Sequence, residues 1–156
     1  MNTGLLSFTL LAGVTVCYAG YNVFVKLSGS VVPATATTTV LATIALQLAA
    51  LAVSVCFYLF LIVRGGSVFE LTGTVYLWAV IAGLCIGLAE IGYLYLFAGA
   101  GGVAAMSANV AIPVVVSGTI VIALAFSVVF LNEQTGLPQF IGAALICCGV
   151  SVLFMR

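Results

Sequence analysis

Long apolar runs, separated by short polar or glycine-rich breaks, occupy almost the whole chain. The five runs cover approximately residues 5–26, 36–63, 74–98, 103–131 and 137–155. A helix needs about 20 predominantly apolar residues to cross a bilayer, and each run is near that length or longer. The pattern predicts an all-α, polytopic membrane protein with five transmembrane helices in one domain over residues 1–156. The two termini would then lie on opposite sides of the membrane.

Composition narrows the class of function. Of the 156 residues, 65% are hydrophobic and 4% are charged, which is typical of an integral membrane protein. We expect it in a plasma or inner membrane. The chain has no His and no Asp, so His-based triads, Asp dyads and most metal sites are excluded, and we expect neither an enzyme nor a cofactor. The formal net charge is zero, which gives no reason to expect nucleic acid as a partner.

One carboxylate, Glu90, interrupts the third apolar run. An ionised carboxylate at the centre of a bilayer costs about 2.5–3.5 kcal/mol on insertion scales, so such residues usually face a cavity or a partner. Gly83, Gly87 and Tyr93 lie three or four residues apart on the helical face that holds Glu90, which would allow another helix to approach closely. Glu90 is therefore a candidate substrate or proton site; the alternative is a protonated residue that only bonds a neighbouring helix.

Polar residues also form a stripe along the first run. Ser7, Thr15, Tyr18, Asn22 and Lys26 are spaced by three, four or their sums, which predicts one helical face. A polar face in lipid must contact protein or water, so Tyr18, Asn22 and Lys26 are candidate binding residues. For Lys26, at the predicted end of the helix, an equally good alternative is that it extends to the membrane interface.

The fourth run contains a proline at a position that would break a helix. Pro113 lacks the N–H that would bond the carbonyl of Asn109. Transporters often bind solutes where spans are interrupted, which makes Asn109 a candidate ligand, although a plain kink in a packed helix fits equally well.

Depth along the helices relates these residues to one another. At about 1.5 Å per residue from a shared membrane side, Tyr18 and Glu90 would lie roughly 12 Å deep, Asn109 roughly 9 Å and Asn22 roughly 6 Å. Pro113 would lie roughly 15 Å deep, near the middle of a roughly 30 Å core. Three spans would thus place polar groups in one layer, which indicates a site for substrate or protons.

From Tyr95 to the C-terminus, the chain resembles the second part of an EamA-type domain of the drug/metabolite transporter superfamily. The residues behind this resemblance are Pro113, Phe130-Leu131-Asn132-Glu133, Gln139-Phe140-Ile141-Gly142-Ala143-Ala144-Leu145-Ile146, Gly149-Val150 and, more weakly, Gly20-Tyr21-Asn22-Val23-Phe24-Val25-Lys26. The resemblance implies a half-transporter of five helices, where members of the family commonly carry two such halves. The basic residue frequent near the start of the family's second helix is absent, and Thr37 to Thr39 occupy that region.

A single half implies a pair. Two copies related by a two-fold axis in the membrane plane reproduce the inverted repeat of many transporters. With the N-terminus on the side of Arg64, the other side holds Lys26 and Arg156, so the charges give almost no orientation bias. This favours insertion in both orientations and an antiparallel homodimer; the alternative is one orientation with a weak bias.

Two functions follow. The first is a proton-coupled or exchange-type secondary transporter of small organic solutes, such as metabolites, amino acids or cationic drugs, in which Glu90 exchanges a proton for substrate. Hydrogen bonds to the substrate would come from Tyr18, Asn22, Tyr93 and Asn109. The partners of this transporter would be the solute, protons, lipid and a second copy. The second is a non-transporting assembly subunit, in which Glu90 is a structural hydrogen bond.

Overall fold

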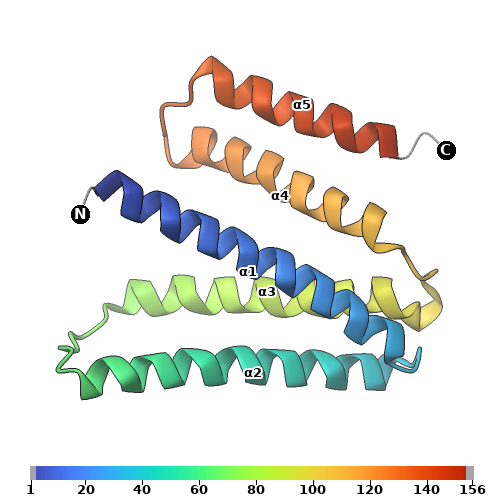
Figure 1. Cartoon of the computed structure of the whole chain (residues 1–156), viewed down its shortest axis with the longest axis horizontal. Coiled ribbons are helices and arrows are strands. Elements are labelled where there is room, and N and C mark those ends of the chain that lie inside the picture. The colour runs from blue at the N-terminus through green and yellow to red at the C-terminus, as the bar shows by residue number, and fades with distance from the viewer. Residues whose placement is uncertain (1–2, 154–156) are drawn as a thin grey trace. The chain divides into compact units, whose positions relative to one another are not determined.

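The computed structural model describes residues 3–153, and every regular element in that range is a helix (Figure 1). The prediction of an all-helical chain is confirmed for these residues. The elements are α1 (Thr3–Val31), α2 (Ala36–Val63), α3 (Gly73–Ala98), the 3₁₀ helix η1 (Ala100–Gly102), α4 (Ala108–Phe130) and α5 (Leu137–Leu153). The predicted residues 154 and 155 of the last helix lie outside the described residues.

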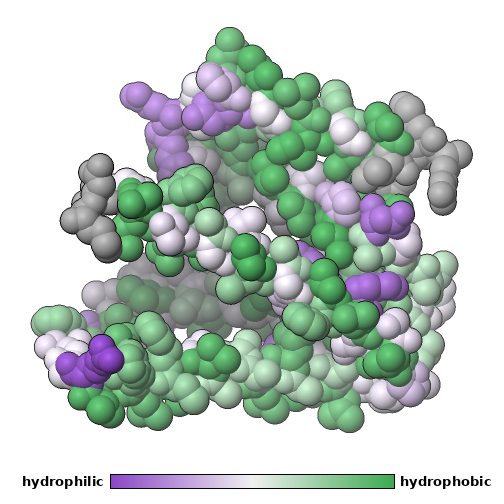
Figure 2. All heavy atoms as spheres, viewed as in Figure 1, coloured by the Kyte–Doolittle hydropathy of each residue, from purple (hydrophilic) through white to green (hydrophobic). Residues whose placement is uncertain are grey.

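Four of these helices are long and apolar enough to cross a membrane. They cover Gly4–Val31, Ala36–Val63, Gly73–Ala98 and Ala108–Phe130, whereas the last apolar helix, Leu137–Val152, is shorter. The chain is therefore a membrane protein with four helices suited to span the bilayer. A fifth crossing stays a prediction. Figure 2 shows large hydrophobic areas on the visible face, as expected for helices surrounded by lipid.

The first helix is longer than the apolar pattern predicts. The predicted end at residue 26 is wrong, because α1 continues to Val31 through Ser28, Gly29 and Ser30. The Ser30 hydroxyl donates to the carbonyl oxygen of Leu27 at 2.7 Å, so this polar turn satisfies its own groups. Lys26 consequently lies five residues inside the helix and not at its end.

The fourth helix begins later than the pattern predicts. The predicted start at residue 103 is wrong, because residues 103–107 are not helical and α4 starts at Ala108. Gly99 ends α3 in the left-handed region at φ 68°, and Gly101 and Gly102 also have positive φ. These glycines allow the chain to turn sharply, and the apolar residues after them form a loop in place of a helical turn.

By contacts, the chain divides into two units, Met1–Ala105 and Met106–Arg156. In the first unit α3 packs against both α1 and α2. Figure 1 shows α2 and α3 side by side, with α1 crossing α3 obliquely. The single domain predicted over residues 1–156 stays a prediction.

The buried residues of the first unit gather towards one end of its helices, where α1 and α3 finish and α2 begins. They are Val25, Gly29, Thr39, Thr43, Glu90, Tyr93, Leu94, Phe97 and Ala100. The Thr39 and Thr43 hydroxyls donate to the carbonyl oxygens of Thr35 and Thr39 within α2, as expected for hydroxyls in apolar helices. The first half of α1 and the second half of α2 are exposed, so the packed region is confined to the end near Glu90.

Helices α1 and α3 approach each other closely at Gly29. A Cβ added to Gly29 would lie 2.6 Å from the Cβ of Phe97 and 3.4 Å from its carbonyl carbon. No side chain fits in this space, so glycine is required by packing. This contact sets the spacing between the two helices that hold the polar residues.

In the second unit, α4 packs against α5. The turn between them passes through Asn132, which has a positive φ of 51°. The Glu133 N–H donates to the carbonyl oxygen of Ser127 at 3.2 Å, and the Ser127 hydroxyl donates to the Glu133 carboxylate. Glu133, part of the family resemblance, therefore acts here as a cap for the end of α4.

Candidate functional site

Glu90 is buried between α3 and α1. Its side chain is 4% exposed, and Oε1 accepts a hydrogen bond from the hydroxyl of Tyr21 in α1. Since α3 is a membrane-spanning helix by length and composition, this carboxyl group lies in an apolar surrounding with a single phenol as a partner for one of its oxygens.

The second oxygen of Glu90 has no such partner. Oε2 is fully buried and makes no hydrogen bond to any residue in the described part of the chain. If the carboxyl is ionised, Oε2 lacks a donor, and if Oε2 is protonated, its O–H lacks an acceptor. A buried polar atom without a partner costs about 1–3 kcal/mol. The site therefore has one unused hydrogen-bonding position on an ionisable group.

A second interhelical hydrogen bond lies beside the first. The Tyr93 hydroxyl donates to Oδ1 of Asn22 at 3.0 Å, and Nδ2 of Asn22 donates to the carbonyl oxygen of Tyr18 at 2.9 Å. Tyr93 is 7% exposed, and its ring centroid is 5.0 Å from that of Phe97. We call Tyr21, Asn22, Glu90 and Tyr93 the Glu90 cluster.

Two predicted residues of α1 lie at the edge of this cluster. Tyr18 is 63% exposed and meets Tyr21 edge to face, with ring centroids 6.3 Å apart. The Nζ of Lys26 lies 5.1 Å from the centroid of the Phe97 ring, so its charge is held against an aromatic face. Tyr18 thus orients Tyr21 and Asn22, and Lys26 places a cation one helical turn beyond Asn22.

The predicted residues of the fourth run belong to the second unit. Asn109 is an exposed residue in the first turn of α4, and Pro113 lies five residues after the start of that helix. The predicted depths of roughly 9 Å and 15 Å assume a helix from residue 103 and therefore do not apply. Because Pro113 is near the N-terminal end of α4, the missing N–H removes a hydrogen bond to the first turn only. Their membership of a common site with Glu90 stays a prediction.

The two glycines predicted beside Glu90 border a groove between α2 and α3. A Cβ on Gly87 would lie 3.4 Å from Nε2 of Gln47 in α2, and one on Gly83 would meet no atom within 4 Å. Glu90 and Tyr93, in contrast, bond residues of α1. Gly83 and Gly87 therefore lie towards α2, whereas Glu90 and Tyr93 bond residues of α1.

Tyr21 is the residue that the polar stripe does not identify. The stripe runs through Tyr18, Asn22 and Lys26, but the buried face of α1 includes the apolar Val25 and Gly29. Tyr21, Val25 and Gly29 are four residues apart and share one side of the helix. A first helix predicted to continue to Val31 would include Gly29. The face formed by Tyr21, Val25 and Gly29 would then be visible in the sequence, and Tyr21 would be a candidate partner of Glu90.

Comparisons with models of known protein families, with curated proteins and with solved structures find no match to this chain. The resemblance to the EamA-type domain therefore rests on the sequence motifs alone.

The Glu90 cluster offers specific chemistry. A buried carboxyl can take up and release a proton, and its unused Oε2 can accept a hydrogen bond from an N–H or O–H donor. The phenols of Tyr21 and Tyr93 add donors and aromatic faces next to it. Within residues 3–153, no three His, Cys, Asp or Glu side chains come together as metal ligands. The cluster is suited to protons and to small hydrogen-bonding or cationic solutes.

Proposed function

We propose that this protein is a secondary transporter of small organic solutes, coupled to protons or working by exchange, in a plasma or inner membrane. The proposal is based on Glu90, whose buried Oε2 has no partner within residues 3–153. An intramembrane ionisable residue with an unused position is suited to bind a proton in one state and a solute in another. A polar or cationic group of the solute could take the place of the proton at Oε2.

The mechanism begins with the hydrogen bond from Tyr21 to Oε1 of Glu90. This bond fixes the carboxyl so that Oε2 presents a defined position to an incoming group. A solute with an N–H or a positive charge would take that position as the proton leaves. Asn22 and Tyr93, which bond each other, would supply further polar contacts when their mutual bond opens.

Alternating access requires more than one copy of this chain. The described part of the first unit has three α-helices and η1, and the Glu90 cluster lies where α1 meets α3. We propose a homodimer of half-transporters related by a two-fold axis in the membrane plane, since such pairs produce an inverted repeat around a central site. The resemblance to one five-helix half of an EamA-type transporter supports the same arrangement.

Flux measurements test this function. Purified protein reconstituted in liposomes is supplied with cationic drugs, amino acids or polar metabolites under an imposed proton gradient. We expect proton-coupled uptake of at least one class, and loss of coupling in Glu90→Gln, because the amide cannot exchange a proton. Glu70→Gln is the matched control, since Glu70 lies in the exposed connection between α2 and α3.

Each outcome has a separate meaning. Equal coupling in Glu90→Gln and the wild type would exclude the proton role of Glu90. Absence of binding and flux for every class would favour an assembly subunit, in which the bond between Tyr21 and Glu90 serves only to hold α1 against α3. Stable co-purification with a different membrane protein would then be the expected observation.

A further inference from the structure

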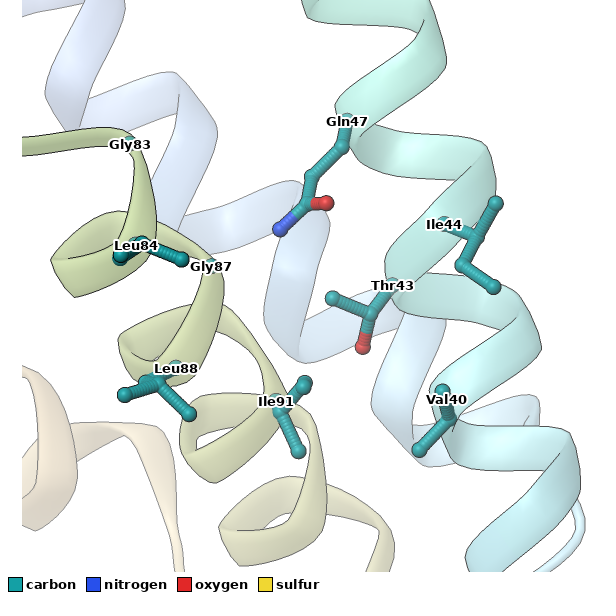
Figure 3. Close-up of a pocket in the computed structure, with 9 residues that line it drawn as sticks. All are labelled: Val40, Thr43, Ile44, Gln47, Gly83, Leu84, Gly87, Leu88 and Ile91. Carbon is teal, nitrogen blue, oxygen red and sulfur yellow. The ribbon is translucent and has the colours of Figure 1, made fainter. Parts of the chain in front are cut away.

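A groove runs between α2 and α3, and Gly83 and Gly87 border it. Its volume is about 290 Å³. Figure 3 shows the residues that line it, which are mostly apolar: Val40, Thr43, Ile44, Gln47, Gly83, Leu84, Gly87, Leu88 and Ile91. Because Gly83 and Gly87 have no side chains, a helix or an acyl chain outside the unit can enter the groove.

Gln47 is the only lining residue with a side-chain amide. Figure 3 shows it pointing from α2 towards α3, near Gly87. The side chain is partly buried, and within residues 3–153 no hydrogen bond joins its amide to another residue. An amide in hydrocarbon without a partner is unfavourable, and helices in membranes commonly associate through such groups.

The Gln47 amide lies near the middle of the membrane-spanning helices. Gln47 is two to three residues from the midpoint of α2 (Ala36–Val63), and Gly83 and Gly87 lie on either side of the midpoint of α3 (Gly73–Ala98). At about 1.5 Å per residue, all three lie within about 4 Å of the middle of their helices. The polar and glycine-rich part of the groove is therefore close to the bilayer midplane.

We propose that this groove is the contact surface for a second copy of this chain, and that the two Gln47 amides hydrogen-bond each other across the dimer axis. This inference deepens the proposed function and rests on its antiparallel dimer. A primary amide is self-complementary, because its carbonyl accepts and its NH₂ donates. A two-fold axis in the membrane plane must pass through the midplane, and only residues at that depth meet their own copies.

The chemistry of the groove favours a second copy over lipid. An acyl chain offers no donor or acceptor, and would leave the Gln47 amide without a partner. A second copy satisfies both amides at once, and the absence of a side chain at Gly83 and Gly87 permits the close approach that such a bond requires.

Cysteine cross-linking in membranes tests the contact and its orientation. The five native cysteines, Cys17, Cys56, Cys85, Cys147 and Cys148, are exposed in the described chain and are first replaced by Ala. In this background we expect Gln47→Cys to form a disulfide-linked dimer on oxidation. The proposed axis brings the two copies of residue 47 together, and a disulfide needs Cα atoms about 4.4–6.8 Å apart. Val40→Cys is the control, because seven residues from Gln47 place the two copies of this position roughly 20 Å apart in an antiparallel pair.

Three results are possible, and each decides the inference. A dimer from Gln47→Cys alone supports it. Dimers from both positions would place the axis along the membrane normal and overturn it. No dimer from Gln47→Cys would also overturn it, and would assign the groove to another occupant, such as lipid or the unit formed by α4 and α5.

A pair of glycine variants tests the same surface without disturbing the protomer. An added side chain at Gly83 or at Gly92 meets no atom within 4 Å of its Cβ, and the two positions, nine residues apart, lie about 180° from each other around α3. We expect Gly83→Leu to raise the Kd of the dimer about tenfold or more in detergent, because it fills the groove. Gly92→Leu should leave the Kd unchanged; equal effects of both variants would contradict the proposal.

The inference and the proposed function fail in different ways. Proton-coupled flux that depends on Glu90, without a Gln47→Cys dimer, would refute the proposed contact at Gln47 and support the transport function. A Gln47→Cys dimer without any flux would support the contact at Gln47 and refute the transport function.

Discussion

At the scale of single residues, the sequence predicts the buried carboxyl but not its partner. Glu90 is identifiable because a charge in an apolar run is costly wherever the helix packs. Tyr21 is not, because a tyrosine is equally common at interfaces, and only the rotation of α1 against α3 decides which ring reaches Glu90. That rotation depends on Val25 and Gly29, which are apolar and add nothing to a polar stripe.

Removal of the Tyr21 hydroxyl tests its role. In Tyr21→Phe neither oxygen of Glu90 has a bond to a described residue, so we expect the free energy of unfolding to fall by about 1–3 kcal/mol. Coupled flux should slow as well, because the carboxyl is no longer held in one orientation. Thermal unfolding in detergent and liposome uptake measure the two effects.

The control for this variant is Tyr58→Phe. Tyr58 is 51% exposed in α2, so loss of its hydroxyl should change neither stability nor flux. Equal behaviour of the two variants would show that the bond between Tyr21 and Glu90 contributes nothing specific.

At the scale of elements, the sequence predicts the helical class of the chain better than the ends of its helices. The ends of α2 and α3 agree with the apolar pattern to within one residue, since polar or glycine-rich segments flank both. The ends of α1 and the start of α4 do not follow it. The polar residues Ser28-Gly29-Ser30 suggest a loop, but α1 continues through them and Gly29 packs against α3. The apolar segment that follows α3 suggests a helix, but three glycines with positive φ turn the chain there, and the segment forms a loop.

The contact at Gly29 predicts a large effect from one methyl group. Gly29→Ala would bring its Cβ to 2.6 Å from the Cβ of Phe97, so α1 must move away from α3. We expect the free energy of unfolding to fall by about 1–3 kcal/mol, as for other overpacked cores. Coupled flux should fall too, because the shift separates Tyr21 from Glu90. Chemical unfolding in mixed micelles measures the stability.

Gly13→Ala provides the comparison in the same helix. No atom lies within 4 Å of an added Cβ at Gly13, so the change should be neutral or stabilise the helix by up to about 1 kcal/mol. A Gly29→Ala protein as stable as Gly13→Ala would show that the helices are not in contact at this position.

At the scale of the whole molecule, the few charges decide how the chain enters the membrane. The sequence predicts almost no bias, with Lys26 counted at the end of the first helix. In the structure, Lys26 lies roughly 8 Å before the end of α1, against the Phe97 ring. Its position inside a helix weakens its effect on orientation, because the rule applies to basic residues in loops. The numbers of basic residues on the two sides of the membrane therefore remain nearly equal. Arg64, at the end of α2, is the basic residue of the connection to α3.

Added charge in that connection tests the dual orientation. Val68 and Glu70 are exposed between α2 and α3, so Val68→Lys with Glu70→Lys raises the basic residues of this connection from one to three without altering a packed side chain. Basic loops are retained in the cytoplasm. A reporter at the C-terminus should therefore be divided between the two sides in the wild type and confined almost entirely to one side in the variant.

The same variant links orientation to assembly. If transport requires an antiparallel pair, a uniformly oriented population cannot form one, so coupled flux and the Gln47→Cys dimer should both fall with the minority orientation. Val68→Ser with Glu70→Ser controls for the loss of the native side chains and should leave both measurements unchanged. A lysine variant with one orientation and full flux would show that the working form is parallel or monomeric, because orientation would then have changed without any effect on transport.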